Sequence, residues 1–445
     1  MQVQPGNWIA PSRSNRSSGR SDEVNEDSCV GDRAAGFMGI NRVVLRASST
    51  PLAGRMGKTT RGTGEAFHVE RDYEQFRLEK PGNKTTVMRE TMAQLSDPKP
   101  AYDLRPADIT TDRDAILHVC SLGSLSCTSA KYHWKYERNP VRGVWCEIAL
   151  ESATKQVVGT TALFARRLLV DGIPFRAAVA GDFAVDPRHR TLYPAIALQR
   201  AAVNSCIEDQ FDVIYAFPND AARPIQIRAG YRAVGSLRAG VRLLHSRNLL
   251  GKHDQGRWWN GAADALDWAV AHVSRESRIR PPRDYVFRPL CAFDARFDSF
   301  WARMLKQYST VLERTASYAN WRFMDCPDKK YSLFAAVHQQ TEEIGGYVVS
   351  WSRQGKTQIS DIMAFDDVFD GLMAALIDSE RQRGAYCLTI LYLGDGSLIH
   401  RLQRFGFLFR KTSSQVLVRV NPKIPAPQRL FDAGNWYLLD GDSDC

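Results

Sequence analysis

The sequence has no stretch of about 20 residues free of charged side chains, the length that a membrane-spanning helix needs. Its N-terminus has no apolar run, so we predict no secretory signal peptide and no membrane partner. None of the 9 cysteines forms a Cys-x-x-Cys pair and most lie in apolar segments, which argues against a disulfide framework and favours the cytoplasm. The 9 histidines include no His-Glu-x-x-His motif, so we expect no metal site.

Basic residues outnumber acidic ones, 59 to 49, yet no block of Lys and Arg occurs. Proteins that bind nucleic acids usually concentrate this charge in a basic stripe, so we expect no nucleic-acid partner. A modest surplus equally suits a polyanionic small molecule. A chain of 445 residues with 44% hydrophobic and 24% charged residues is typical of two to three globular domains.

Residues 1–100 differ in composition from the rest of the chain. They are rich in Ser, Arg, Gly, Asn and Thr and show no sustained apolar period. We expect this segment to be disordered or, because Met88 directly precedes sequence of ordered character, to be an over-extended start. From Tyr102 onward, strand and helix patterns alternate, with a hairpin turn at Asp171-Gly172 and a helix from Pro194.

The pattern of the first half recurs in order in the second half, with a leading displacement of 187 residues. The matched pairs are Trp134 with Trp321, Gly159 with Gly346, Asp182 with Asp361, and Gly230 with Gly406. Such a series predicts two copies of one fold, at 101–246 and 284–420. A linker at 247–283 then contributes a helix near 258–276, and 421–445 form a C-terminal tail. Trp134 and Trp321, with the residues around them, form a Trp motif that is present in both copies, and we interpret this motif as holding the fold.

The first copy resembles the GNAT superfamily of N-acyltransferases in the segments GDFAVDPRHRTLYPAIALQRA and VIYAFPNDAARPIQIRAGYR. The resemblance implies an α/β (α+β) class: two tandem GNAT-like folds, each a mixed, mostly antiparallel sheet flanked by helices. It also implies acetyl-CoA or another acyl-CoA as co-substrate, and a small-molecule, sugar or peptide amine as acceptor. The tandem arrangement is similar to double-GNAT proteins and to FemABX-like aminoacyl transferases, which leaves aminoacyl transfer as an alternative.

In this family the strand of Asp182 leads into a loop that binds the pyrophosphate at a helix N-terminus, where backbone N–H groups are free. The family's loop has two glycines, whose places Thr191 and Tyr193 take here, and Pro194 removes one donor. Asn219 either contacts the pantetheine arm or caps the following helix. The resemblance gives as cofactor-binding candidates Arg188, Arg190, Thr191, Leu192, Tyr193, Ala195 and Asn219.

Acyl transfer to an amine needs a base for the amine proton. Asp182 is the candidate, with a structural ion pair as the competing interpretation, and Glu147 is the alternative base. The family's usual tyrosine acid falls on Gln226 here, so the leaving thiolate would rely on Tyr231, Tyr193 or solvent. The missing glycines and tyrosine keep a second hypothesis open, a non-catalytic ligand-binding or scaffold protein.

The second copy differs from the first at its cofactor loop. Asp366, Asp367 and Asp370 open the corresponding helix, where they satisfy the helix dipole and repel a polyanion. We therefore predict one acyl-CoA per chain, bound by the first copy. The tail carries aspartates at calcium-loop spacing, but no glutamate follows, so we interpret it as a solvated or docked tail.

Overall fold

The computed structural model describes residues 101–123, 125–208, 210–245, 279, 281–424 and 427–444. The predicted N-terminal segment, the helix expected near 258–276 and most of the linker lie outside these residues. The first copy contains β1 (Tyr102–Pro106), α2 (Arg113–Leu122), α3 (Ser129–Tyr132), η1 (His133–Glu137), β2 (Val144–Glu151), β3 (Val157–Val170), β4 (Ile173–Val185), η2 (Pro187–His189), α4 (Leu192–Ile207), β5 (Val213–Ala216), α5 (Ala222–Ala229) and β6 (Arg232–Leu243).

The second copy follows the same order, with an additional short strand, β8, before its α8 helix. It contains β7 (Tyr285–Leu290), α7 (Ala295–Met304), η4 (Leu305–Gln307), β8 (Thr310–Leu312), α8 (Ala316–Ala319), η5 (Asn320–Met324), β9 (Tyr331–His338), β10 (Ile344–Arg353), β11 (Lys356–Ala364), α9 (Asp366–Gln382), β12 (Cys387–Gly394), α10 (Gly396–Gln403) and β13 (Leu408–Val420). The tail adds η6 (Pro427–Phe431), η7 (Ala433–Asn435), β14 (Trp436–Leu439) and η8 (Asp440–Asp442).

The predicted repeat is confirmed, because its marker residues occupy equivalent elements. Trp134 lies in the π-helical turn η1 after α3, and Trp321 lies in the π-helical turn η5 after α8. Gly159 is on β3 and Gly346 on β10, the second strand of the three-strand meander in each copy. The helix that we expected from Pro194 starts two residues earlier, at Leu192 of α4.

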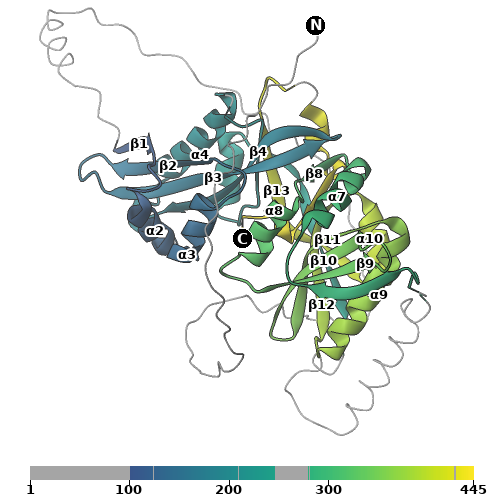
Figure 1. Ribbon diagram of the computed structural model, residues 1–445. Helices are drawn as coiled ribbons and strands as arrows, with labels where there is room; N and C mark the ends of the chain where they lie inside the picture. The colour runs from purple at the N-terminus through teal and green to yellow at the C-terminus, as the bar shows by residue number, and fades with distance from the viewer. Residues whose placement is uncertain are drawn as a thin grey trace, which may run out of the picture. The chain divides into compact units, whose positions relative to one another are not determined.

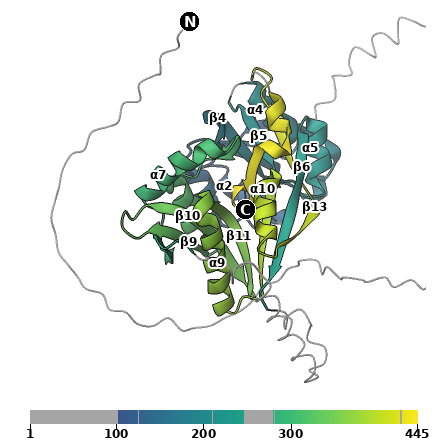
Figure 2. The same cartoon turned by 90° about the vertical axis from the view of Figure 1, so that its right-hand side faces the viewer.

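The two copies share one 14-stranded sheet, in which their last strands are exchanged (Figures 1 and 2). Strand β6 pairs with β12 of the second copy, β13 pairs with β5 of the first, and the two exchanged strands pair with each other. Each copy therefore completes its part of the sheet with the last strand of the other copy. Since the copies repeat one fold, the edge strand of each accepts the last strand of the other, as in domain swapping.

Each exchanged strand places an arginine at the C-terminal end of a helix of the other copy. Arg419 of β13 lies beside Gly230, the C-cap of α5, and Arg242 of β6 lies in the same way beside Gly406, which follows α10. Both glycines have positive φ angles, 114° and 78°. Cationic side chains at helix C-termini interact favourably with the helix dipole, so each exchanged strand stabilises a helix of the other copy.

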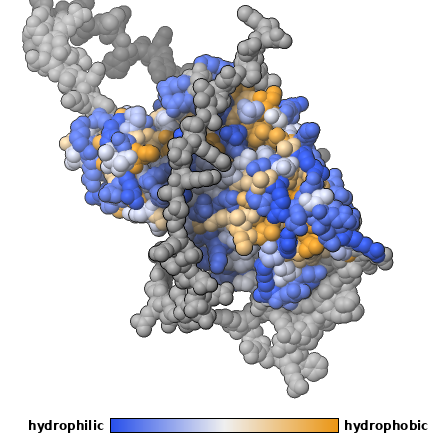
Figure 3. Space-filling view, viewed as in Figure 1, coloured by the Kyte–Doolittle hydropathy of each residue, from blue (hydrophilic) through white to orange (hydrophobic). Residues whose placement is uncertain are grey.

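The helices lie on both faces of the sheet of the first copy. Helix α2 packs on β3 and β4 from one side, while α4 packs beside α5 and covers β3 from the other. On the face drawn in Figure 3 the exposed surface is mostly hydrophilic, and its hydrophobic side chains form separate patches. Among the described residues no helix combines the length and the apolar character needed to cross a membrane.

The tail is docked onto the rest of the protein. Strand β14 pairs with β12 and with β8, which in turn pairs with β3 of the first copy. Trp436 and Leu438 are buried, and the Asp442 carboxylate forms a buried ion pair with Arg314 at 2.8 Å. Of the two interpretations left by the sequence, the docked tail is therefore correct, and one of its aspartates, Asp442, is part of the interior.

Candidate functional site

The candidate site is a crevice where two neighbouring strands of the first copy separate. Strands β4 and β5 run parallel and pair from Ala177 with Val213 to Ala180 with Ala216, and then diverge. A cavity of about 470 Å³ opens beyond this point. Its walls come from 183–185 at the end of β4, from 190–195 at the start of α4, from 219–225 at the start of α5, and from Gly123 after α2.

The edge of β4 that faces the crevice has no strand beside it in the described ladder. A bulge adds to this irregularity: Asp182 and Phe183 together oppose Thr161 alone in the β3–β4 ladder. Asp182 takes the left-handed φ angle of 45° at this bulge. On the other edge, β5 pairs with β4 only as far as Ala180, so the backbone of β4 beyond this point has no strand partner there and an extended ligand with amide groups can hydrogen-bond along it.

The N-terminus of α4 opens into the same crevice. Thr191 is its N-cap, and the Thr191 side chain makes no capping hydrogen bond. The amides of Leu192 and Tyr193, in the first turn, lack helical partners, whereas Pro194 has no N–H. Arg190 lines the cavity beside them, and its Nε donates to the carbonyl oxygen of Val185 at 3.3 Å. A cation and two free amides therefore converge, as anion binding requires.

Most of the predicted cofactor-binding residues come together here. Those that line the cavity are Arg190, Thr191, Leu192, Ala195 and Asn219. Arg188 does not line it: its guanidinium is 69% exposed and pairs with Asp186 at 2.7 Å. The Tyr193 ring also lies outside the lining, stacked on Tyr102 with centroids 6.2 Å apart. The bulky residue in the second glycine position is thus turned away from the crevice.

Asn219 has the capping role that the sequence left open. Its Oδ1 accepts hydrogen bonds from the amides of Ala221 at 3.1 Å and Ala222 at 2.8 Å. The side chain lines the cavity at the same time. Capping and lining are compatible, because the cap fixes the start of α5, which forms one wall of the crevice.

The sequence did not point to the other wall residues. They lie after α2, on β4 and at the start of α5, and are Gly123, Phe183, Ala184, Val185, Ala221, Ala222 and Ile225. A Cβ at Gly123 would lie only 2.8 Å from the Ala184 Cβ, so a small residue is needed where α2 approaches β4. The alternation of small and apolar residues in AGDFAV was the available signal for β4, whereas nothing local marks Gly123 as a wall residue.

The predicted base, Asp182, lies outside the cavity lining. Its side chain is 9% exposed and accepts from Lys135 Nζ at 2.7 Å and from the Tyr136 hydroxyl at 3.0 Å. Lys135 is itself only 3% exposed. This is the structural ion pair that competed with the catalytic interpretation in the sequence.

Tyr231 and Glu147, the other catalytic candidates, also lie away from the lining. Tyr231 is 2% exposed, and its burial, more than nearby Cys206, raises the pKa of its hydroxyl. Glu147 is buried on β2, where desolvation and then the charge of Glu208 raise its pKa to about 7. Arg190 is the one ionisable side chain among the residues that line the cavity.

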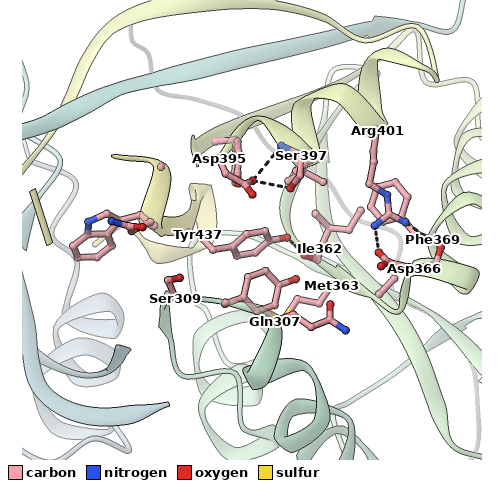
Figure 4. Close-up of a pocket in the computed structure, with 17 residues that line it drawn as sticks. Gln307, Ser309, Ile362, Met363, Asp366, Phe369, Asp395, Ser397, Arg401 and Tyr437 are labelled. Carbon is pink, nitrogen blue, oxygen red and sulfur yellow. Dashed lines mark hydrogen bonds and ion pairs between the residues drawn. The ribbon is translucent and has the colours of Figure 1, made fainter. Parts of the chain in front are cut away.

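The second copy has a smaller crevice at the equivalent place, of about 180 Å³ (Figure 4). Asp366 opens α9, where a phosphate would have to bind, and it accepts from Arg401 of α10 at 2.6 Å. Tyr437 of β14 projects into this crevice, and its hydroxyl donates to the carbonyl oxygen of Ile362 on β11. Carboxylates and the docked tail therefore take the positions that stay open in the first copy.

Solved structures with a similar fold include GNAT proteins. A protein of Enterococcus faecalis V583 described as a "probable N-acyltransferase" aligns with a TM-score of 0.54 and 10% identity, over 72% of this chain and 73% of that one. A GCN5-related N-acetyltransferase of Anabaena variabilis aligns with a TM-score of 0.52 and 12% identity, over 72% of each chain. A tandem GNAT protein from the clavulanic acid biosynthesis pathway aligns at a TM-score of 0.46 and 12% identity, over 73% of this chain and 100% of that one.

At these identities the likeness shows the fold: the chain is a tandem GNAT-fold protein. Its class is therefore mixed α/β, as the sequence predicted. No family model and no curated protein matches the sequence.

Proposed function

We propose that the protein is an N-acyltransferase that takes the acyl group of acetyl-CoA or another acyl-CoA and transfers it to an amine. The observation that carries the proposal is the crevice between β4 and β5, which ends at the N-terminus of α4 beside Arg190. A pyrophosphate suits this end, because the Leu192 and Tyr193 amides and the Arg190 guanidinium offer donors and positive charge.

The remainder of the donor suits the rest of the crevice. A pantetheine arm is extended and carries two amide groups, and β4 offers an edge without a neighbouring strand from Gly181 to Val185. Strand-like hydrogen bonding to such an edge is a common mode of recognition for extended chains. The apolar side chains of Phe183, Val185 and Ile225 contact the arm between these bonds.

Catalysis then consists of holding the thioester at the bulge of β4 and removing a proton from the attacking amine. Positioning of the two reactants can contribute several kcal/mol, about 7–11 in well-oriented cases. A carboxylate that accepts the amine proton typically contributes about 10²–10⁴-fold in rate.

A second candidate function is binding of acyl-CoA without transfer. The observation in its favour is that the lining formed by the described residues contains no carboxylate, histidine or other candidate base, and that Arg190 is its one ionisable side chain. A protein of this kind would bind the donor and leave its thioester intact.

A turnover assay separates the two functions. Release of the CoA thiol from acetyl-CoA is followed with hydroxylamine, glucosamine, spermidine, lysine and glycylglycine as acceptors. The proposal predicts acceptor-dependent thiol release by the wild-type protein, with the acylated amine identified by mass. Binding of acetyl-CoA with no acceptor-dependent release would instead establish the second function.

A further inference from the structure

The C-terminal tail crosses from the second copy onto the first. After β14, the Gly441 carbonyl accepts from Arg322 Nε at 2.8 Å. The carbonyl of Asp442 then accepts from the hydroxyl of Tyr215, a residue of β5 in the first copy, at 3.1 Å. The last described residue, Asp444, is thereby brought to the first copy.

The side chain of Asp444 packs against β4 at Gly181, where the bulge of that strand begins. Its carboxylate contacts Gly181 so closely that any side chain at that position would collide with Oδ2. Lys135 Nζ lies 3.8 Å from the same oxygen, and the Asp444 side chain is 28% exposed. A carboxylate supplied by the tail thus lies over the bulge and still reaches solvent.

Gly181 and Asp444 lie beyond the lined part of the cavity, where the thioester of the proposed donor would end. With the pyrophosphate at the first turn of α4, the arm runs back along β4 from Val185 toward Gly181. It cannot run further, because β4 is paired with β5 from Ala180 onward. Four residues of strand span about 13 Å, so the reactive end of an extended arm comes to the bulge beside Gly181.

The other carboxylates of the region are less well placed to accept a proton. Asp182 is 9% exposed, against 28% for Asp444, and its two carboxylate oxygens accept from Lys135 at 2.7 Å and Tyr136 at 3.0 Å. Glu147 of β2 lies directly opposite Thr161 of β3, so the two side chains are on the same face of the sheet. The Thr161 hydroxyl accepts from Gln199 of α4, and Glu147 is therefore on the face that α4 covers. Gly181 faces Phe164 on the opposite side, in the core that α2 and α3 cover.

From these relationships we infer that Asp444 is the general base of acyl transfer in the first copy, an inference that rests on the proposed function. The amine nitrogen attacks the carbonyl carbon of the thioester, and one N–H proton passes to the Asp444 carboxylate. The C–N bond forms, the C–S bond breaks, and CoA leaves as the thiolate, which takes a proton from solvent. Lys135 holds the carboxylate in place. The second copy then contributes to catalysis, because it holds the tail that carries Asp444.

Asp444→Asn tests this role in the full-length protein, with Asp444→Glu as the conservative variant and Asp440→Asn as the matched control. Asp440 belongs to the same tail but accepts from Ser360 of the second copy. We expect Asp444→Asn to bind acetyl-CoA as the wild type does and to lose about 10²–10⁴-fold in kcat. Asp444→Glu should recover part of the rate, and Asp440→Asn should keep it. The measurement uses the best of the primary amines above, with hydroxylamine in parallel.

Hydroxylamine gives a readout that a structural role would not move. It is uncharged at neutral pH and reacts readily without a base, so its acylation should fall much less in Asp444→Asn than acylation of an alkylamine. Equal losses with both acceptors, an unchanged kcat, or a faster turnover would overturn the role of Asp444 while leaving acyl transfer intact. A wild-type protein that binds acetyl-CoA but acylates none of the acceptors would overturn the proposed function and this inference with it.

Discussion

The indoles of Trp134 and Trp321 exchange hydrogen bonds across the two copies. Trp134 Nε1 donates to the carbonyl oxygen of Trp321 at 2.6 Å, and Trp321 Nε1 donates to that of Trp134 at 2.9 Å. The rings stack with centroids 5.0 Å apart. Since each residue occupies the equivalent place in its copy, this contact lies on the axis that relates the copies. The sequence predicted that these two residues hold the fold, and the structure adds that they do so by joining the two copies.

Replacing either tryptophan with phenylalanine should destabilise the protein by about 1–3 kcal/mol, because a buried carbonyl oxygen loses its donor. The double variant should lose less than the sum of the two single losses, since both substitutions remove parts of one contact. Urea unfolding of the four proteins measures this coupling. Strict additivity would show that the two indoles act independently.

Asp182→Asn should lower stability first. The substitution leaves the buried Lys135 ammonium without its closest carboxylate, and breaking a buried pair in this way costs about 3–5 kcal/mol. Urea unfolding measures the loss, and acetyl-CoA affinity and turnover are compared below the unfolding transition. If stability is unchanged while turnover falls by orders of magnitude, Asp182 is the base that the sequence suggested.

Glu147 should make stability depend on pH. Its pKa is about 7 in the folded protein against 4.5 for an ordinary glutamate, so the folded state holds the proton more tightly. The resulting stabilisation is complete below about pH 4.5 and is lost as the pH rises through 7. Between pH 5 and 8 the wild type should therefore lose about 2 kcal/mol relative to Glu147→Gln. Urea unfolding of both proteins at the two pH values measures the difference, and parallel curves would assign Glu147 an ordinary pKa.

Arg190 and Arg188 form a matched pair for the donor site. They are two residues apart and carry the same charge, but Arg190 lines the crevice and Arg188 is bound to Asp186. Arg190→Glu should weaken acetyl-CoA binding by at least about 100-fold, because a charge-assisted phosphate contact is lost and replaced by repulsion. Arg188→Glu should change the dissociation constant by no more than about 3-fold. Equal effects would mean that both act only through overall charge.

Much of the fold could be predicted because residues close together in the sequence mark each element of the repeat. The Asp171-Gly172 turn, the glycines at 159 and 346 and the two Trp motifs each mark an element by its own residues. The strand exchange could not be predicted in the same way. Strands β6 and β13 both fit the same kind of edge, and the choice between them depends on contacts between residues far apart in the chain, such as Arg419 with Gly230.

For the site, too, only the part formed by neighbouring residues in the sequence could be predicted. The loop from Arg190 to Ala195 follows from the order strand, loop and helix, and the structure brings it to the crevice with Asn219. The tail contributes through distant contacts, so no spacing in the sequence relates Asp444 to Gly181. The role of Asp182 could not be decided from its motif. Its residue type and position suit a base, but its ion pair with Lys135 depends on the packing of η1 under β4.

Donor binding by the first copy alone is tested most directly by the number of acetyl-CoA molecules bound per chain, measured by calorimetric titration. The two crevices have the same topology, yet Asp366 and Tyr437 occupy the second one, so we predict one site. Removing the three aspartates together, as Asp366→Asn, Asp367→Asn and Asp370→Asn, should leave that number at one, because the tail still fills the crevice. Arg190→Glu should abolish the site. Two equivalent sites in the wild type, or a site that survives Arg190→Glu, would contradict the assignment of donor binding to the first copy.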